Sequence, residues 1–346
     1  MRRFRNVLLC AVAFAGAFAG GAETASAVSG ALYAWGSDSG GQVSNVPEGN
    51  AFVAIAAGPS HGLALDTNGR IHGWGSASGG QLSNLPLGTG FTAIAAGQWA
   101  DLAVNASGEI EGWGSDLSGV LSGAPSGAGF VAVQVGTQGP APGGDPSTPM
   151  GSFGVALDAS GQIHAWGADD MGQVSNAPVG TGFIAISCKG MHCLAAGSSG
   201  EIYAWGWDGF GQVSGVPSGR GFSGIAAGLF TSLALDLSRA IDVWGTTPAG
   251  TPAGNGYRAI AAGAAHNLAV DSAGAIHGWG LDISGEINSA PSETDFFRVA
   301  AGTYWSLALR AAPPAVPTLA FDGKLILGAL LLGLAFSALS AKTCAA

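Results

Sequence analysis

The sequence has very little charge of either sign. Of its 346 residues only 12 are Lys or Arg, and charged residues make up 10%, where an average globular domain has about 25%. Between residues 28 and 312 there are 20 acidic and only 7 basic side chains. Because nucleic-acid binding depends on neutralising phosphates with Lys and Arg, we expect no DNA or RNA partner.

The sequence also lacks the motifs of common enzyme classes in the context that they need. It shows no nucleophile elbow, phosphate-binding loop or dinucleotide fingerprint at a turn that opens a helix, and no metal-ligand spacing. A metal site needs three or four convergent ligands, whereas the histidines occupy two positions of a repeat: His72, His164 and His277 in one, and His61, His192 and His266 in the other. We therefore expect no catalytic centre, no cofactor and no metal, and expect the first of these histidine positions to face solvent.

Glycine, in contrast, is abundant, with 60 residues. Each glycine inside a helix costs about 1 kcal/mol relative to alanine, which argues against long helices. No Gly-X-Y period is present, and Val, Ile, Leu and Phe are plentiful between the glycines, so neither collagen nor a disordered chain fits. The composition predicts a turn-rich, mostly β protein.

The N-terminal 27 residues have the pattern of a secretory signal peptide. A basic start at Arg2, Arg3 and Arg5 precedes an apolar run over 7–19, and Ala-Ser-Ala at 25–27 fits a cleavage site. The alternative is an uncleaved membrane anchor.

The C-terminal end has the pattern of a membrane or sorting segment. Residues 311–324 form a Pro/Ala linker, 325–341 are apolar and flanked by Lys324 and Lys342, and 342–346 are a short tail. The apolar length is at the lower limit for a membrane helix. Val-Pro-Thr-Leu at 316–319 resembles bacterial C-terminal sorting signals that open with Ile/Val-Pro-Thr-Leu, and a plain membrane anchor is the alternative. Both interpretations place the body outside the cytoplasm, in the envelope or at the surface of a bacterium.

Between these ends the dipeptide Trp-Gly recurs with a period near 40. The tryptophans are Trp35, Trp74, Trp113, Trp166, Trp205, Trp244 and Trp279. A second marker, Ala-Ala-Gly, keeps step with them and ends at Gly58, Gly97, Gly228, Gly263 and Gly302, with Gly136 and Lys189 in the same position of two irregular repeats. Such a period indicates a solenoid or a propeller.

One repeat unit, residues 52–83, reads as four short β segments separated by Gly, Asn and Asp turns. Four strands in about 40 residues are typical of a propeller blade. The repeat region, 28–310, begins with the last two segments of a unit and ends with the first two. We therefore predict an all-β, monomeric, seven-bladed propeller of four-stranded blades, closed by strands from both termini and followed by a C-terminal apolar helix.

The repeat consensus Ala-Ala-Gly-x-x-His-x-Leu-Ala-Leu-Asp, followed by Gly-x-Ile-x-x-Trp-Gly and Gly-Gln, resembles the regulator of chromosome condensation repeat. The resemblance implies a seven-bladed propeller. The variant Gln-Val-x-x-Val-Pro at 42–47 and 212–217 is more similar to secreted bacterial members, one of which is a β-lactamase-inhibitory propeller. In that relative the partner-binding residues lie in loops of one face. The nucleotide-exchange activity of the eukaryotic namesake is a less favoured expectation.

Because successive strands are antiparallel, the loop after Ala-Ala-Gly and the loop after Trp-Gly must share one face of the ring. These loops hold the residues that we predict to bind a protein partner: Trp99, Phe230, Tyr304, Trp305, Trp207, Phe210, Asp38, Asp116, Asp169, Asp170, Asp208 and Asp282. Exposed aromatics are typical of protein-binding hot spots. Aspartates at such positions also commonly bond to their own turn, which is the alternative for each Asp. An expansion at 137–150 falls in the same set of loops.

Two of the four cysteines, Cys188 and Cys193, flank one hairpin loop. They are candidates for a cross-strand disulfide in an oxidising compartment, or else for two buried thiols.

Taken together, these features predict an exported or surface-anchored module that binds an unidentified protein, with β-lactamase inhibition as one instance. The second hypothesis is a propeller that binds or cleaves envelope glycans at its channel mouth.

Overall fold

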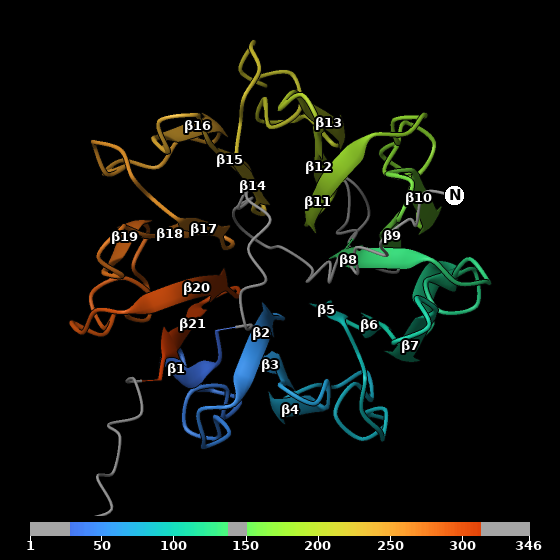
Figure 1. Cartoon of the computed structure of the whole chain (residues 1–346), viewed down its shortest axis with the longest axis horizontal. Coiled ribbons are helices and arrows are strands. Elements are labelled where there is room, and N and C mark those ends of the chain that lie inside the picture. Colours follow the sequence, from blue (N-terminus) through green and yellow to red (C-terminus); the bar gives the residue numbers. More distant parts are fainter. Residues whose placement is uncertain (1–27, 138–150, 313–346) are drawn as a thin grey trace, which may run out of the picture. The chain divides into compact units, whose positions relative to one another are not determined.

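The computed structural model describes residues 28–137 and 151–312 (Figure 1). The predicted signal peptide, almost all of the 137–150 expansion, and the C-terminal sorting motif, apolar helix and tail lie outside the described residues. Within the two described ranges, the chain contains no apolar helix of membrane-spanning length.

The described chain folds into antiparallel sheets arranged as a β-propeller (Figure 1). Five sheets have three consecutive strands each: β5(Ala93–Ala96), β6(Ala100–Val104) and β7(Ile110–Gly114); β8(Phe130–Thr137), β9(Ser152–Asp158) and β10(Ile163–Gly167); β11(Phe183–Lys189), β12(His192–Gly197) and β13(Ile202–Gly206); β14(Gly224–Ala227), β15(Thr231–Leu235) and β16(Ile241–Gly245); β17(Ala259–Ala262), β18(His266–Val270) and β19(Ile276–Gly280). A short 3-10 segment, η1(Leu117–Gly119), follows β7.

The sixth sheet joins the two ends of the repeat region. It contains β20(Phe296–Ala301), β21(Trp305–Ala311), β1(Gly30–Gly36), β2(Phe52–Ala57), β3(His61–Asp66) and β4(Ile71–Gly75), in that order. β1 pairs with β21 over seven residues, from Gly30↔Ala311 to Gly36↔Trp305, but with β2 only at Gly30↔Phe52. The sheet thus comprises two three-strand groups, and the predicted pairing of strands from both ends is present. We call each three-strand group a blade.

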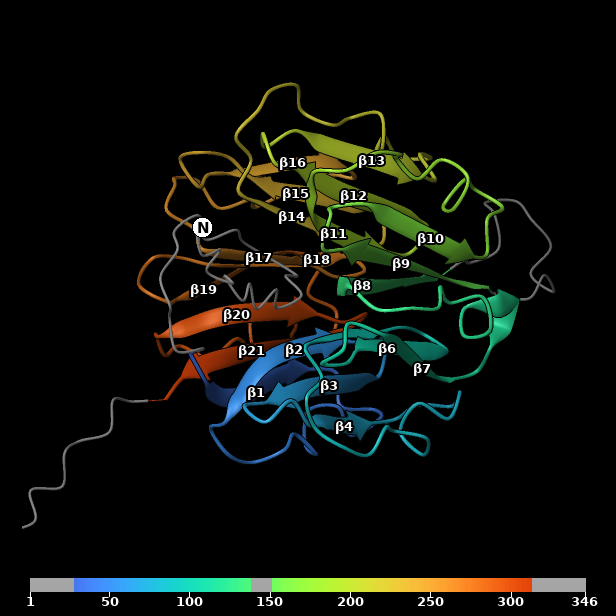
Figure 2. The ribbon, with the colours of Figure 1, turned by 45° about the vertical axis from the view of Figure 1, so that its right-hand side comes forward.

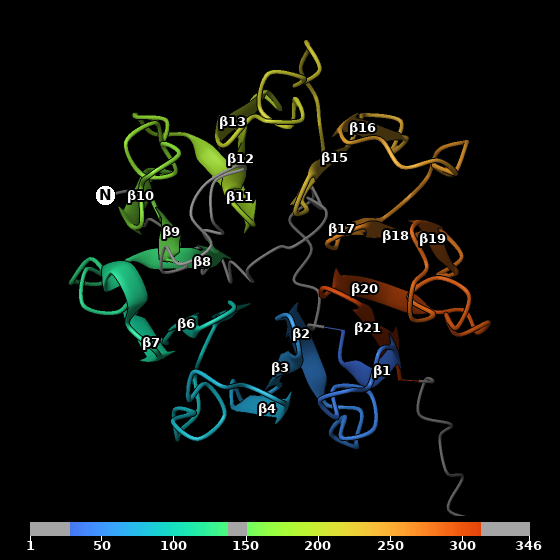
Figure 3. The same ribbon diagram turned by 180° about the vertical axis from the view of Figure 1, so that it is seen from behind.

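In every blade the first strand is innermost and the third is outermost (Figures 1 and 3). Figure 2 shows the blades following one another around the ring. The hydrophobic core lies between neighbouring blades. One cluster, for example, combines Leu63 and Leu65 of β3 with Phe91, Ile94 and Trp113 of the next blade. All seven Trp-Gly tryptophans are buried in such layers, so the repeated tryptophan is a packing residue.

The predicted fourth strand of the blade is wrong. The segment around Gln42 is a turn, in which the amide of Asn45 donates to the carbonyl of Gly41, and Gly41 has a φ of +77°. The Asp38 carboxylate accepts the amides of Val43 and Ser44 at 2.8 and 2.9 Å. Because these amides bond to a side chain, they are not available for a sheet ladder. The blades therefore have three strands and an outer turn.

The outer turn holds the next blade in place. The indole Nε1 of Trp74 donates to the carbonyl of Gln42. The same bond joins Trp113 to Gln81, Trp205 to Gln173, Trp244 to Gln212, Trp166 to Val120 and Trp35 to Glu286. Each of these acceptors lies in the preceding blade, so the repeated tryptophan links blades by a hydrogen bond as well as by packing.

Candidate functional site

The two sets of loops predicted to share a face are joined by backbone hydrogen bonds in each blade. The amide two residues after each Trp donates to a carbonyl in the turn between the first two strands: Ser37 to Tyr304, Ser76 to Ser60, Ser115 to Trp99, Ala168 to Ser152, Trp207 to Met191, Thr246 to Phe230 and Leu281 to Ala265. We call this side of the ring the Trp-Gly face. Gly75 shows why glycine follows the tryptophan: its φ is +93°, and a Cβ there would lie 2.6 Å from the Ser60 carbonyl oxygen.

Three of the predicted aromatic residues form one cluster on the Trp-Gly face. The ring centroids of Phe210 and Phe230 are 5.3 Å apart, those of Trp207 and Phe210 are 5.3 Å apart, and those of Trp207 and Phe230 are 6.1 Å apart, all edge to face. Trp207 and Phe210 follow β13, whereas Phe230 precedes β15 in the next blade. The Phe210 side chain is 53% exposed. The aromatic cluster is therefore an apolar, solvent-accessible group that spans two blades.

The remaining predicted aromatics do not join this cluster. Tyr304 occupies the position equivalent to Phe230 in another blade and is 47% exposed. On the loop before it, Leu281 and Ile283 are exposed at 59% and 65%; as aliphatic residues, these two lie outside the predicted set of aromatic and acidic side chains. Trp99 is half-buried, and its Nε1 is buried without a hydrogen-bond acceptor in the described part of the chain.

The assignment of Trp305 to the partner face is wrong. Its side chain is fully buried, and its Nε1 donates to the carbonyl of Gly58 in the neighbouring blade at 3.0 Å. Trp305 stands at the first position of a middle strand, where other repeats have His61, His192 or His266. Those histidines also bond to the next blade, at Asp101, Ser232 and Ser306 respectively. The position is an inter-blade contact in each case.

The predicted aspartates cap turns. Oxygens of Asp38, Asp116, Asp169, Asp208 and Asp282 each accept the amides five and six residues ahead, at 2.7 to 3.1 Å. The backbone amides of Ser44 and Val43 lower the pKa of Asp38, and that of Ile287 lowers the pKa of Asp282. The alternative interpretation, a turn-capping role, therefore describes these five residues, whereas Asp170 makes none of these capping bonds and is exposed.

The outward-facing histidines have partners as well. His72, His164 and His277 bond through Nε2 to Asp66, Asp158 and Asp271 at 3.0, 2.9 and 2.8 Å. Each of these aspartates also accepts amides of its own Asp-x-x-Gly turn, on the face opposite to the Trp-Gly face. The side chains are about one third exposed, from 31% to 38%, so the expectation that this position faces solvent is correct only in part.

Cys188 and Cys193 are bonded to each other as a disulfide, with their Cα atoms 4.2 Å apart. They stand directly opposite one another in the register of β11 and β12. The disulfide therefore closes the hairpin that carries Lys189.

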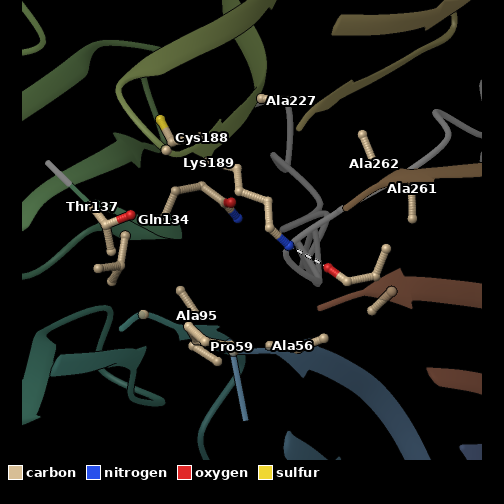
Figure 4. A pocket seen from close by; sticks show the side chains of 18 of the residues that line it. Ala56, Pro59, Ala95, Gln134, Thr137, Cys188, Lys189, Ala227, Ala261 and Ala262 are labelled. Atoms are coloured by element: carbon tan, nitrogen blue, oxygen red, sulfur yellow. Dashed lines mark hydrogen bonds between the residues drawn. The ribbon is translucent and has the colours of Figure 1, made fainter. Parts of the chain in front are cut away.

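A cavity of about 390 Å³ lies at the centre of the ring, at its Trp-Gly end (Figure 4). Its wall is mainly the paired alanines of the innermost strands, such as Ala56, Ala95 and Ala261. Gln134 and Lys189 point into it (Figure 4), and Lys189 Nζ donates to the carbonyl of Ala301. Within residues 28–137 and 151–312, the lining contains no carboxylate and no aromatic ring.

This geometry defines the chain as a β-propeller. The model of the regulator of chromosome condensation (RCC1) repeat matches residues 52–81. The repeat is therefore of the RCC1 type, as the sequence motif indicates. A comparison with curated proteins gives no match.

Solved structures share the fold. Human WBSCR16 is 16% identical, with a TM-score of 0.64 over 82% of this chain and 99% of that chain. Prp20p from Saccharomyces cerevisiae, in a structure whose report covers binding to Gsp1p and histones, is 17% identical, with a TM-score of 0.62 over 84% and 93%. Yeast RCC1 (Prp20) bound to Kap60 is 18% identical, with a TM-score of 0.60 over 83% and 90%. At this identity the likeness concerns the fold.

Proposed function

We propose that the protein is a binding module whose Trp-Gly face docks a protein partner, with the aromatic cluster of Trp207, Phe210 and Phe230 as its anchor. The observation that carries the proposal is the contact of these three rings across two blades, with Phe210 more than half exposed. Hot spots of protein interfaces are enriched in aromatics, and pre-packed rings bury area on binding at a small entropic cost.

The fold relatives support the same kind of function. The yeast propeller Prp20p is described with Gsp1p, histones and Kap60 as its partners. The loops of this chain differ from one repeat to the next, so the propeller supplies the platform and the loop side chains select the partner. Nothing in the aromatic cluster points to those particular proteins, and a β-lactamase is one candidate partner among others.

The residues that line the centre of the ring argue against the second hypothesis, a site that cleaves or binds glycans. Glycan-cleaving sites use two carboxylates that flank the scissile bond, and sugar sites use aromatic platforms. The lining of the central cavity, within the described chain, has neither. We therefore propose a module without enzymatic activity and place glycan binding second.

We also propose that the ring has seven blades, two of them within the six-stranded sheet, and that the protein is exported and held at the cell envelope. The signal-like sequence at 1–27 supports export, and the Cys188–Cys193 disulfide suits an oxidising compartment. Cell fractionation tests the export: recovery of the chain in the cytoplasm, with its signal sequence intact, would contradict it.

Affinity capture from envelope extract tests the binding face. The full chain is compared with a Phe210→Ala/Phe230→Ala variant and with a matched control, Leu87→Ala/Val179→Ala. The control removes two side chains that are 98% and 95% exposed in the connections on the opposite face. We expect the first variant to lose the captured protein and the control to keep it. Equal capture by all three proteins would refute the proposed face.

A further inference from the structure

The residues that line the central cavity are more polar at the end of β11 than at the ends of most other innermost strands. Elsewhere the innermost strands end mainly in Ala-Ala-Gly, whereas β11 ends in Ser187, Cys188 and Lys189. Lys189 is the only lysine between residues 28 and 312. Among the lining residues that the structure describes, it is also the only side chain that titrates, because Cys188 is in a disulfide. The position therefore places a single cation in an otherwise neutral, alanine-rich space.

The amino group of Lys189 reaches across the channel. From β11 it donates to the carbonyl oxygen of Ala301, at the end of β20 on the other side (Figure 4). An ammonium has three N–H donors, so two remain after this bond. No carboxylate of the described residues lies within ion-pair distance of Nζ. A partly buried cation is costly unless an anion compensates it, and the described lining of the cavity supplies none.

The electrostatics around Lys189 are simple. Burial lowers the pKa of Lys189 to about 8. Lys189 interacts electrostatically with His266 of β18, whose pKa is lowered to about 4 by burial and also by Lys189, while Asp282 opposes that shift. His266 is therefore neutral over the range in which Lys189 titrates, and among the described lining residues Lys189 is the one that carries charge.

We infer that this cavity is a binding site for a small organic monocarboxylate, with the carboxylate paired to Lys189 Nζ and its apolar part against the alanine wall. A volume of about 390 Å³ is in the range of small-ligand pockets. One cation matches one negative charge, whereas a doubly charged phosphate would meet a body with 20 acidic and 7 basic residues. Gln134, which points into the same space, offers an amide donor for the second carboxylate oxygen (Figure 4). The described lining of the cavity does not include Trp207, Phe210 or Phe230, so this site and the aromatic cluster can be tested separately.

The test follows the Lys189 amine by NMR in the full chain labelled with ¹³C at lysine Cε. Lys189→Met identifies the resonance, and its thermal unfolding shows that the fold is kept. Butyrate is the probe, butyramide its uncharged analogue and inorganic phosphate the competing anion. We expect butyrate to shift the resonance saturably and to raise the pKa of Lys189, and the two other probes to leave it unchanged. Gln134→Leu should weaken butyrate binding several-fold.

The pH dependence has a defined sign. Binding requires the ammonium form of Lys189 and the carboxylate form of butyrate, so the butyrate affinity should be constant between about pH 6 and pH 7 and fall about tenfold per pH unit above pH 8. Three results would overturn the inference: no saturable shift with butyrate, an equal shift with butyramide, or unchanged calorimetric affinity in Lys189→Met. A blocked glutamate peptide that shifts the resonance where butyrate does not would assign the carboxylate to a protein side chain and also overturn it.

Discussion

The indole Nε1 of Trp74 lies 3.0 Å from the carbonyl oxygen of Gln42, which belongs to the preceding blade. The Gln42 side chain is 2% exposed, and its Oε1 accepts the amide of Gly40 at 2.8 Å. The side chain of the repeated glutamine thus stabilises the outer turn. The backbone carbonyl of the same glutamine accepts a hydrogen bond from the repeated tryptophan of the next blade. Sequence motifs about 30 residues apart are therefore two halves of one inter-blade contact.

Because of this contact, we expect Trp→Phe to destabilise the protein more at Trp74 than at the equivalent Trp279. Before Trp279 the connection over 245–257 is shortened and lacks the Asp and Gln of the outer turn, and the buried Nε1 of Trp279 has no acceptor in the described chain. Trp74→Phe removes a hydrogen bond and leaves a buried carbonyl unpaired, which costs about 1–3 kcal/mol. Trp279→Phe should cost less, and chemical denaturation of both variants measures the difference. Equal losses of unfolding free energy in the two variants would mean that the tryptophans stabilise the contact between blades by packing alone.

A second prediction contrasts a buried with an exposed aromatic. Trp305→Ala should destabilise the protein by about 3–5 kcal/mol, because it empties a fully buried site and removes the bond to Gly58. Trp305→His should retain part of this stability, since histidine fills the same position in three other repeats. Phe210→Ala should change stability by less than about 1 kcal/mol. A large loss of melting temperature in Phe210→Ala would show that the aromatic cluster is structural.

A third prediction is a gain of stability. Ala77 occupies the position at which Asp38 caps the outer turn in the previous blade. Ala77→Asp should supply the same acceptor to the amides of Leu82 and Ser83 and stabilise the protein by about 0.5–1 kcal/mol. Thermal unfolding of this variant, with Ala77→Asn alongside it, measures the gain. A lower melting temperature in Ala77→Asp would contradict the capping role.

A fourth prediction concerns pH. Burial lowers the pKa of both His192 and His266 from 6.5 to about 4. Between these values the unfolded chain binds protons that the native state does not, so stability falls as the pH drops from about 6.5 to about 4, by roughly 3 kcal/mol for each histidine. His192→Thr, which introduces the residue found at Thr231 of the next repeat, should remove the contribution of His192 to the pH dependence of the unfolding free energy. Denaturation midpoints at pH 7 and pH 4.5 test this, and an unchanged slope in the variant would contradict it.

Much of the fold could be predicted from the sequence, because period and turn residues report directly on local geometry. The spacing of Trp35, Trp74 and their equivalents predicts blades and their order. The fourth strand was predicted wrongly because Gln42 and Val43 look like a strand, while the bond that decides their conformation comes from the Asp38 side chain.

The site could be predicted only in part. Antiparallel alternation places Phe210 and Phe230 on one face, but their contact depends on how neighbouring blades are oriented, which no local motif encodes. Trp305 was misplaced because it stands beside the exposed Tyr304, and residue type does not reveal which of two neighbours points inward. Lys189 stands where most other repeats have the glycine of Ala-Ala-Gly, and this difference in the sequence could have indicated a charged residue in the central cavity.

Site-specific photo-crosslinking tests whether the aromatic cluster contacts a protein partner. A photoreactive phenylalanine analogue is placed at position 210, and at position 87 on the opposite face as the control, in cells that express the full chain. We expect one dominant crosslinked protein from position 210 and none from position 87. The same products from both positions, or products from position 87 alone, would contradict the proposed binding face.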